Sequence, residues 1–168
     1  MLLPLFVFFY SNDTGFNALL VSFCAGAGST RNPHFPKSPE EPKLVYIGPE
    51  AEDYVPDGIL NLSGQTSFDE LLVLLKHAKL HVGPEGGMIH MRHALCGLPS
   101  CVLFGPTSAT FYGYAENHNL ETGGVCISSC EWMVDHWQGI CLKTNSNICK
   151  KLQALGPEAV FDVISFYL

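Results

Sequence analysis

The sequence predicts an α/β fold in which helices flank a parallel β-sheet. Short apolar runs such as Leu44–Ile47 and Ser100–Phe104 each lead into a Gly-Pro turn, which is typical of buried strands. Segments with apolar residues at helical spacing lie between such runs, and strands that alternate with helices favour a parallel sheet. The 168 residues are 47% hydrophobic and 15% charged, which favours one folded domain and excludes a largely disordered chain.

The expected elements begin near residue 17. We expect strands at 17–24, 44–47, 59–62, 80–82 and 100–104, and helices at 67–78, 88–96 and from Pro157 to the C-terminus. Ser67 and Glu70 form a capping box at the start of the first helix, and Gly97 marks the end of the second. The run at 17–24 is expected to be a buried parallel strand. Residues 25–43 show no helical pattern, so the crossover after it is expected to be a loop.

Composition and charge limit the possible domain organisation and binding partners. We divide the chain into an apolar N-terminal segment (1–16) and one folded domain (17–168), with a cysteine-rich excursion at 124–150. The first ten residues lack the basic region and cleavage site of a signal peptide and are too short to cross a bilayer. No transmembrane segment is therefore expected. The net charge of −7 argues against binding to nucleic acid and to anionic membranes.

The seven cysteines, an odd number, exclude a scaffold in which every cysteine is paired. Cys24, Cys96 and Cys101 lie in apolar runs and are interpreted as buried free thiols, which is typical of a reducing, cytoplasmic location. The remaining four follow the pattern C-x3-C-x10-C-x7-C, which suits a tetrahedral zinc or iron site; four free thiols or two disulfides are the alternatives. These four are Cys126, Cys130, Cys141 and Cys149.

The stretch Val82-Gly-Pro-Glu-Gly-Gly-Met-Ile-His90 predicts a strand, a glycine-rich turn and the start of a helix. The first N–H groups of a helix have no partner within it, and with the helix dipole they can bind an anion. Gly86 and Gly87 would let a phosphate approach the backbone, and His90 lies one turn further on the same face. A plain turn with a hydrogen-bonded histidine is the alternative. Of the other histidines, His77, His81 and His118 are expected at the surface or at strand ends. His93, beyond His90, is expected only to pack.

An ordered set of short motifs extends from Leu62 to Thr107. The set comprises Leu62-Ser-Gly-Gln-Thr-Ser-Phe-Asp-Glu-Leu71, Ala78-Lys-Leu-His-Val-Gly83, Glu85-Gly-Gly-Met-Ile-His90, Gly97-Leu-Pro99 and Leu103-Phe-Gly-Pro-Thr107. In order and spacing it resembles glycosyltransferase family 9, which includes the heptosyltransferases of bacterial lipopolysaccharide synthesis. The resemblance covers about residues 60–107 closely and residues 21–168 more loosely.

The resemblance implies a Rossmann-like fold like that of the C-terminal, donor-binding half of a GT-B glycosyltransferase. It implies a nucleotide-diphospho-sugar donor of the ADP-heptose type and inverting transfer to a hydroxyl of a lipopolysaccharide or other glycan acceptor. No cofactor is required for catalysis in the family, so a metal at the cysteines would be structural. The family's acceptor half, which supplies the catalytic base, is not expected here, so the catalytic residues stay unassigned. An acceptor-domain partner or a homo-oligomer is expected to complete the site.

The family's donor loop is carried over residue by residue. Glu85 stands at the family's aspartate, Gly86 at its serine or threonine, Gly87 at its glycine and His90 at its histidine. Glu85 is one methylene longer than aspartate and Gly86 lacks the hydroxyl, which typically costs about 1 kcal/mol where a hydrogen bond is lost. Donor affinity or donor identity is therefore expected to differ from the family's usual pattern.

Two further segments resemble donor-binding parts of the family. Ala25-Gly-Ala-Gly-Ser29 resembles its first donor-domain turn, with either Arg31 or His34 as the cation. Glu50 or Glu52 would contact a ribose hydroxyl, and a solvated acidic cluster is the alternative. The competing function for the whole chain is a non-catalytic donor-domain remnant or interaction module, with or without a structural metal at the cysteines.

Overall fold

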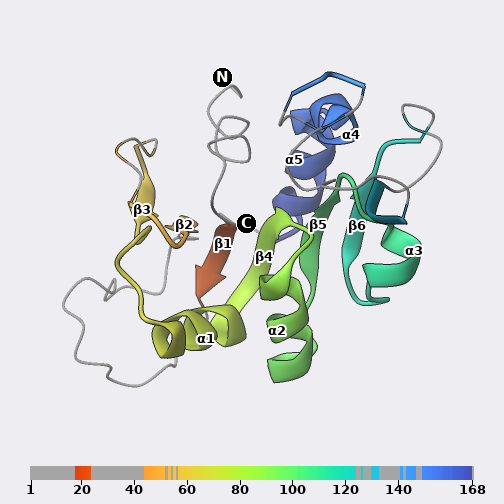
Figure 1. Ribbon diagram of the computed structural model, residues 1–168. Helices are drawn as coiled ribbons and strands as arrows, with labels where there is room; N and C mark the ends of the chain where they lie inside the picture. The colour runs from red at the N-terminus through yellow and green to blue at the C-terminus, as the bar shows by residue number, and fades with distance from the viewer. Residues whose placement is uncertain are drawn as a thin grey trace.

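The computed structural model describes residues 18–23, by their backbone alone, together with 44–51, 53, 55, 57–123, 126, 130–132, 141, 143–146 and 149–167. The described elements form a β-sheet with helices on both faces (Figure 1). This is the α/β, Rossmann-like architecture that the sequence predicts. The expected N-terminal segment 1–16 and most of the cysteine-rich excursion 124–150 lie outside the described residues.

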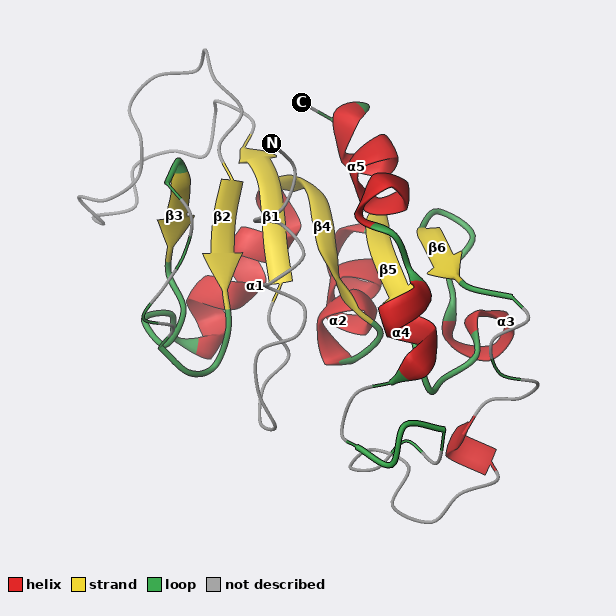
Figure 2. Cartoon of the chain, turned by 90° about the horizontal axis from the view of Figure 1, so that it is seen from above, coloured by secondary structure: helices red, strands yellow, loops and turns green. Residues whose placement is uncertain are grey.

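The sheet has six strands in the order β3-β2-β1-β4-β5-β6 (Figure 2). This is the order of the Rossmann sheet. Parallel pairing joins β2 to β3, β4 to β5 and β5 to β6. The strands are β1 (Ala18–Phe23), β2 (Leu44–Ile47), β3 (Ile59–Asn61), β4 (Ala78–Pro84), β5 (Ser100–Phe104) and β6 (His118–Glu121).

Strand β1 has the expected place in the sequence but the opposite direction. It pairs antiparallel with both β2 and β4, and Phe23 at its end is opposite Ala78 at the start of β4. The expectation of a parallel strand was therefore wrong. An antiparallel strand needs no helical crossover to reach its neighbour, which agrees with the missing helical pattern in residues 25–43. The other five strands share one direction, so their carboxyl ends meet at one edge of the sheet.

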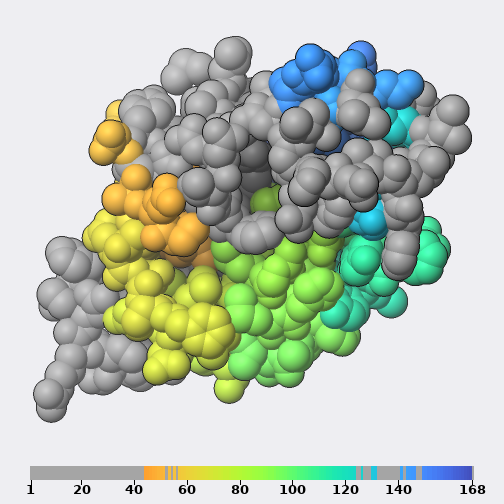
Figure 3. All heavy atoms as spheres, in the orientation of Figure 1, coloured from red at the N-terminus to blue at the C-terminus, as the bar shows by residue number. Residues whose placement is uncertain are grey.

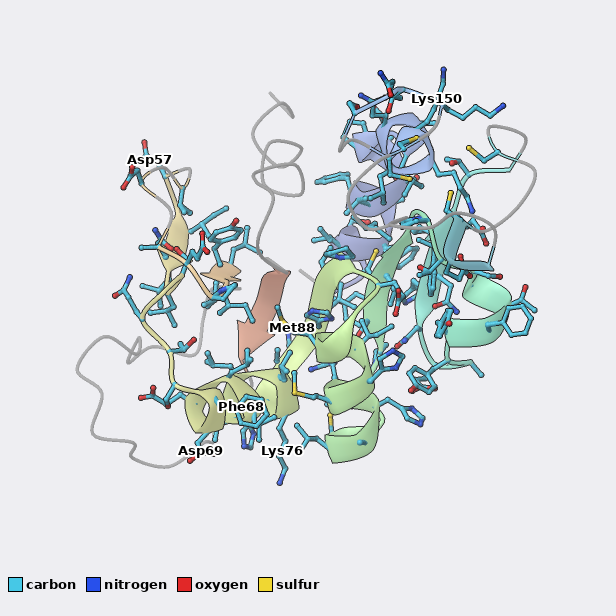
Figure 4. All side chains as sticks on the ribbon, in the orientation of Figure 1. Asp57, Phe68, Asp69, Lys76, Met88 and Lys150 are labelled. Carbon is cyan, nitrogen blue, oxygen red and sulfur yellow. The ribbon has the colours of Figure 1, made fainter. Side chains whose placement is uncertain are left out.

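Helices α1 (Phe68–His77) and α2 (Gly87–Cys96) cover one face of the sheet, and α4 (Lys150–Ala154) and α5 (Pro157–Ser165) cover the other (Figure 2). Leu74 and Leu75 of α1 pack with Val45 and Ile47 of β2. The opposite core joins strands β4 and β5 to α5. Figure 3 shows the side chains of α1 and α2 side by side on one surface, and Figure 4 shows Met88 of α2 close to α1, where it packs against the α1 core.

The ends of both predicted helices are where the sequence places them. Ser67 caps α1, and the Ser67 and Glu70 side chains make the reciprocal bonds of a capping box. These hydrogen bonds, first from the Ser67 backbone and then from its hydroxyl, lower the pKa of Glu70. Helix α2 ends at Gly97, whose φ of 59° is a left-handed conformation that glycine adopts at low cost.

Four short elements were not expected. They are α3 (Ala109–Tyr112), β6, the 3₁₀ turn η2 (Cys130–Trp132) and α4. Every helix in the described part of the chain is too short or too polar to cross a membrane.

Two polar side chains are buried between the sheet and α2. Arg92 of α2 is fully buried and donates to five backbone carbonyl oxygens at the end of α1, the start of β4 and the loop before β5: those of Leu75, Ala78, Lys79, Leu98 and Pro99. His81 of β4 is 1% exposed, so the expected surface or strand-end position was wrong. Its Nδ1 lies 3.2 Å from Ser100 Oγ.

Candidate functional site

The loop that joins β4 to α2 is the core of the candidate site. Strand β4 ends at Pro84 and α2 begins at Gly87, so the predicted change from strand to helix occurs as expected. The Glu85 N–H donates to Leu103 O at 3.1 Å, which ties the loop to β5. The loop therefore lies at the carboxyl edge of the parallel strands, where open α/β sheets bind their ligands.

The first turn of α2 has the properties of an anion site. Gly86 is the N-cap and offers no side chain to bind the first N–H groups of the helix. A Cβ atom on Gly87 would meet nothing within 4 Å, so no internal packing requires glycine there and the space above its backbone is open. Uncapped N–H groups beside open space can receive the oxygens of a phosphate group.

His90 is held between two partners. Its Nδ1 lies 2.8 Å from the Tyr114 hydroxyl oxygen, and its Nε2 lies 3.4 Å from Glu85 Oε1. The neutral imidazole satisfies both partners in one tautomer, in which Tyr114 donates to Nδ1 and Nε2–H is directed toward Glu85. Together the two contacts hold the His90 ring so that its Nε2 lies on the side of the Glu85 loop. Glu85 is expected to cap N–H groups or bind a sugar hydroxyl, but its carboxylate lies beside His90.

A second histidine supports the same tyrosine. The His93 ring stacks on the Tyr114 ring with 3.7 Å between centroids and 8° between planes. His93 Nδ1 also lies 2.5 Å from Glu116 Oε1, and this hydrogen bond lowers the pKa of Glu116. Tyr114 is further held through its carbonyl oxygen, which accepts from Asn119 Nδ2 at 3.0 Å. Tyr114 is thus fixed by both its ring and its backbone, and it can position His90.

The remaining predicted donor residues are only partly placed. Glu50 is exposed and follows the carboxyl end of β2. Because β2 and β4 run in the same direction, Glu50 and the Glu85 loop lie at the same edge of the sheet. Ser29, Arg31, His34 and Glu52 lie outside the described residues, so their roles stay predictions.

The four C-terminal cysteines are all free thiols, and they are grouped. The Cys130 thiol interacts electrostatically with the other three, and burial first and these neighbours next raise its pKa. Burial also opposes ionisation of Cys141, but hydrogen bonds from Thr144, Lys150 and Lys143 outweigh it and lower the pKa of Cys141 to about 7. Cys126 and Cys149 complete the group. Within the described ranges, no three Cys, His, Asp or Glu side chains are placed so that they could hold a metal ion.

Sequence reasoning found the loop but missed its support. Tyr114 and Glu116 were given no role and His93 only a packing role, although the Tyr112-Gly-Tyr114 run lies only a few residues beyond the Phe-Gly-Pro-Thr motif. Aromatic residues next to a recognised motif are a usable signal. The contact itself joins residues 24 positions apart, and no spacing rule connects them.

The comparisons with known proteins bear on this site. The model of glycosyltransferase family 9 (heptosyltransferase) matches residues 38–135, which include β2 to β6, the Glu85 loop and Tyr114. No curated protein and no solved structure matches the chain. The matched residues are more than half of the 168, and the motif order and strand order agree with this match. The chain therefore belongs to glycosyltransferase family 9.

Proposed function

We propose that this chain binds the diphosphate of a nucleotide-sugar at residues 85–90 and is the donor-binding part of a glycosyltransferase. The observation that carries the proposal is the uncapped start of α2 beside a histidine whose Nε2 is directed to the same loop. Membership of family 9 supports a sugar donor. We further propose a donor of the ADP-heptose type and a hydroxyl of lipopolysaccharide or another glycan as the acceptor.

The chemistry assigns a distinct task to each part of the loop. In an inverting transfer, the acceptor oxygen bonds to the anomeric carbon, the bond from that carbon to the diphosphate breaks, and a base takes the hydroxyl proton. Negative charge then grows on the departing nucleoside diphosphate. The N–H groups at the start of α2 and the Nε2–H group of His90 would stabilise that charge where it develops.

Glu85 would adjust the selectivity of the loop. A carboxylate that faced the diphosphate directly would repel it, but Glu85 is 13% exposed and lies beside His90 Nε2. When a phosphate oxygen binds Nε2–H, Glu85 would be released toward the sugar, whose hydroxyl groups are suitable donors to it. Glu50 at the same edge of the sheet would meet the ribose.

Calorimetric titration with ADP tests the proposal. We expect His90→Ala to bind ADP about tenfold or more weakly than the unchanged protein, because hydrogen bonds to charged groups contribute about 1.5–3 kcal/mol. His77→Ala is the matched control, because His77 is an exposed histidine in the last turn of α1. Equal affinity of the unchanged protein and His90→Ala would exclude the diphosphate role of His90. Failure of ADP and of a panel of other nucleoside diphosphates to bind would overturn the proposed function.

A further inference from the structure

We propose that Tyr114 is a positioning residue for donor binding, whose hydroxyl group fixes the tautomer of His90 so that Nε2–H is presented to the diphosphate. This inference deepens the proposed function and rests on it. The Tyr114 hydroxyl oxygen lies 2.8 Å from His90 Nδ1, which is the distance of a well-formed hydrogen bond. The two rings lie at 81° to each other with their centroids 5.6 Å apart. The hydroxyl group, and not a stacked ring face, therefore makes the specific contact.

The position of one proton on His90 decides whether its ring can bind a phosphate group. A neutral imidazole carries its proton on one nitrogen, and the other nitrogen is an acceptor. With the proton on Nδ1, Nε2 would turn a lone pair toward the phosphate oxygens and repel them. A donor at Nδ1 favours the other tautomer, with the proton on Nε2. Nε2 is the atom that lies 3.4 Å from Glu85 Oε1, on the side of the loop, so Tyr114 favours the tautomer that can bind an anion there.

Tyr114 is itself held against the face of α2 that carries His90. The His93 ring, one helical turn after His90, stacks on the Tyr114 ring with 3.7 Å between centroids. Glu116 Oε1 lies 2.5 Å from His93 Nδ1 and holds that ring in turn. Asn119 Nδ2 donates to the Tyr114 carbonyl oxygen at 3.0 Å. Side-chain and backbone contacts together thus leave the hydroxyl group little freedom to move away from Nδ1.

The turn before Tyr114 leaves no room for a side chain. Gly113 is the C-cap of α3, and a Cβ atom there would lie 2.5 Å from the Ala109 carbonyl oxygen and 2.8 Å from Asn119 Nδ2. Asn119 is also the residue that binds the Tyr114 carbonyl oxygen, so the close approach at Gly113 and the position of Tyr114 depend on each other. The glycine lets the chain turn tightly between α3 and β6 (Figure 1), and Tyr114 lies in this turn.

The tautomer of His90 is measured first, with no nucleotide present. Nitrogen-15 NMR of the labelled 168-residue protein distinguishes a protonated from an unprotonated ring nitrogen. It is recorded at about pH 8.5, roughly two units above the ordinary pKa of histidine. The His90 signals are assigned by their loss in His90→Ala. We expect the Nε2–H tautomer in the unchanged protein and a mixture of tautomers in Tyr114→Phe, which keeps the ring that stacks on His93.

Tyr112→Phe is the matched control for this measurement. Tyr112 belongs to the same short run of sequence, and its ring packs against the Ile89 core. Loss of its hydroxyl group should leave the His90 tautomer as it is in the unchanged protein. An Nδ1–H tautomer in the unchanged protein, or an undiminished Nε2–H tautomer in Tyr114→Phe, would overturn the inference.

Calorimetric titration with ADP then measures the effect on binding. Tyr114→Phe should bind ADP about threefold to tenfold more weakly, which is the range for the loss of one neutral hydrogen bond. Tyr112→Phe should bind ADP as the unchanged protein does. In the His90→Ala background, Tyr114→Phe should cause no further loss, because a residue that acts only through His90 loses its role when His90 is removed.

The results separate this inference from the proposed function. Binding of ADP that depends on His90 but is the same in Tyr114→Phe would overturn the positioning role alone. An additive loss in the double variant would also overturn it, because Tyr114 would then act on ADP without His90. Failure of every nucleoside diphosphate to bind would overturn the donor-binding function and this inference with it.

Discussion

His81 carries the clearest pH sensitivity among the described residues. The side chain is 1% exposed, and its Nε2 has no hydrogen-bond partner in the described part of the chain. Burial first, and the positive charge of Arg92 second, lower the pKa of His81 to about 3 from an ordinary value of 6.5. His81 therefore stays neutral in the folded protein at neutral pH.

This shift predicts a loss of stability toward acid. Between pH 6.5 and about 3, the unfolded chain binds a proton at His81 that the folded chain does not, so the free energy of unfolding should fall as the pH falls. One such proton contributes a slope of up to about 1.4 kcal/mol per pH unit. The free energy of unfolding, measured with urea at several pH values in this range, should change less steeply with pH for His81→Asn than for the unchanged protein. His77→Ala serves as the control. If the unfolding free energy of His81→Asn and of the unchanged protein depended on pH in the same way, the acid sensitivity could not be assigned to His81.

The sequence predicts single residues well where local geometry decides their place. Glu85, Gly87 and His90 occupy the loop and helix turn that their spacing indicates. Tyr114 could not be predicted, because its contact with His90 depends on how the chain between β5 and β6 returns past α2. The burial of His81 was predicted wrongly because the expected strand covered only residues 80–82, which placed this polar side chain near a strand end. Strand β4 in fact extends from Ala78 to Pro84.

At the scale of elements, capping decides how well a helix can be predicted. Helix α1 was predicted to within one residue at each end because Ser67 and Glu70 define its start and a 3.6-residue apolar pattern defines its length. The short elements α3, β6 and α4 have four or five residues, too few for any periodic pattern. The direction of β1 relative to its neighbours could not be predicted either, because an apolar run indicates a buried strand but not whether it pairs parallel or antiparallel.

Removal of the α1 cap should destabilise the protein measurably. Ser67→Ala deletes the hydroxyl that binds the Glu70 N–H, and loss of an N-cap typically costs about 1 kcal/mol. Urea unfolding at neutral pH measures the effect. Ser165→Ala serves as control, because Ser165 lies at the exposed end of α5 and caps no N-terminus. A Ser67→Ala variant as stable as Ser165→Ala would show that packing, and not the capping box, holds the start of α1.

At the scale of the whole molecule, each carboxylate beside the tyrosine-supported loop contacts a histidine. Glu85 contacts His90 and Glu116 contacts His93, and our proposal assigns Glu85 to the sugar hydroxyls and Glu50 to the ribose, so it assigns no carboxylate to the proton of an acceptor hydroxyl. General-base catalysis requires such a group within hydrogen-bond reach of that hydroxyl. The fold class and family were predictable from the sequence because they rest on the order of several motifs, each tied to one strand or helix.

We therefore expect the 168-residue chain to bind a nucleoside diphosphate and to show no transfer by itself. The assay incubates the chain with a nucleotide-sugar and a glycan acceptor and measures release of the nucleoside diphosphate. Addition of an acceptor-binding domain from family 9 is the complementary arm. Measurable transfer by the isolated chain would contradict this expectation and would place the base within these residues.

The guanidinium of Arg92 determines how the sheet and both helices of one face stay joined. Its donors reach five carbonyl oxygens in two stretches of the chain, 75–79 and 98–99, and within the described part of the chain no carboxylate is among its hydrogen-bond partners. Acid therefore has no carboxylate partner of Arg92 to protonate among these bonds. Dissolved salt has little access to the guanidinium, because the side chain is fully buried. A lysine in its place could offer only three donors, so the joint depends on the guanidinium of this arginine.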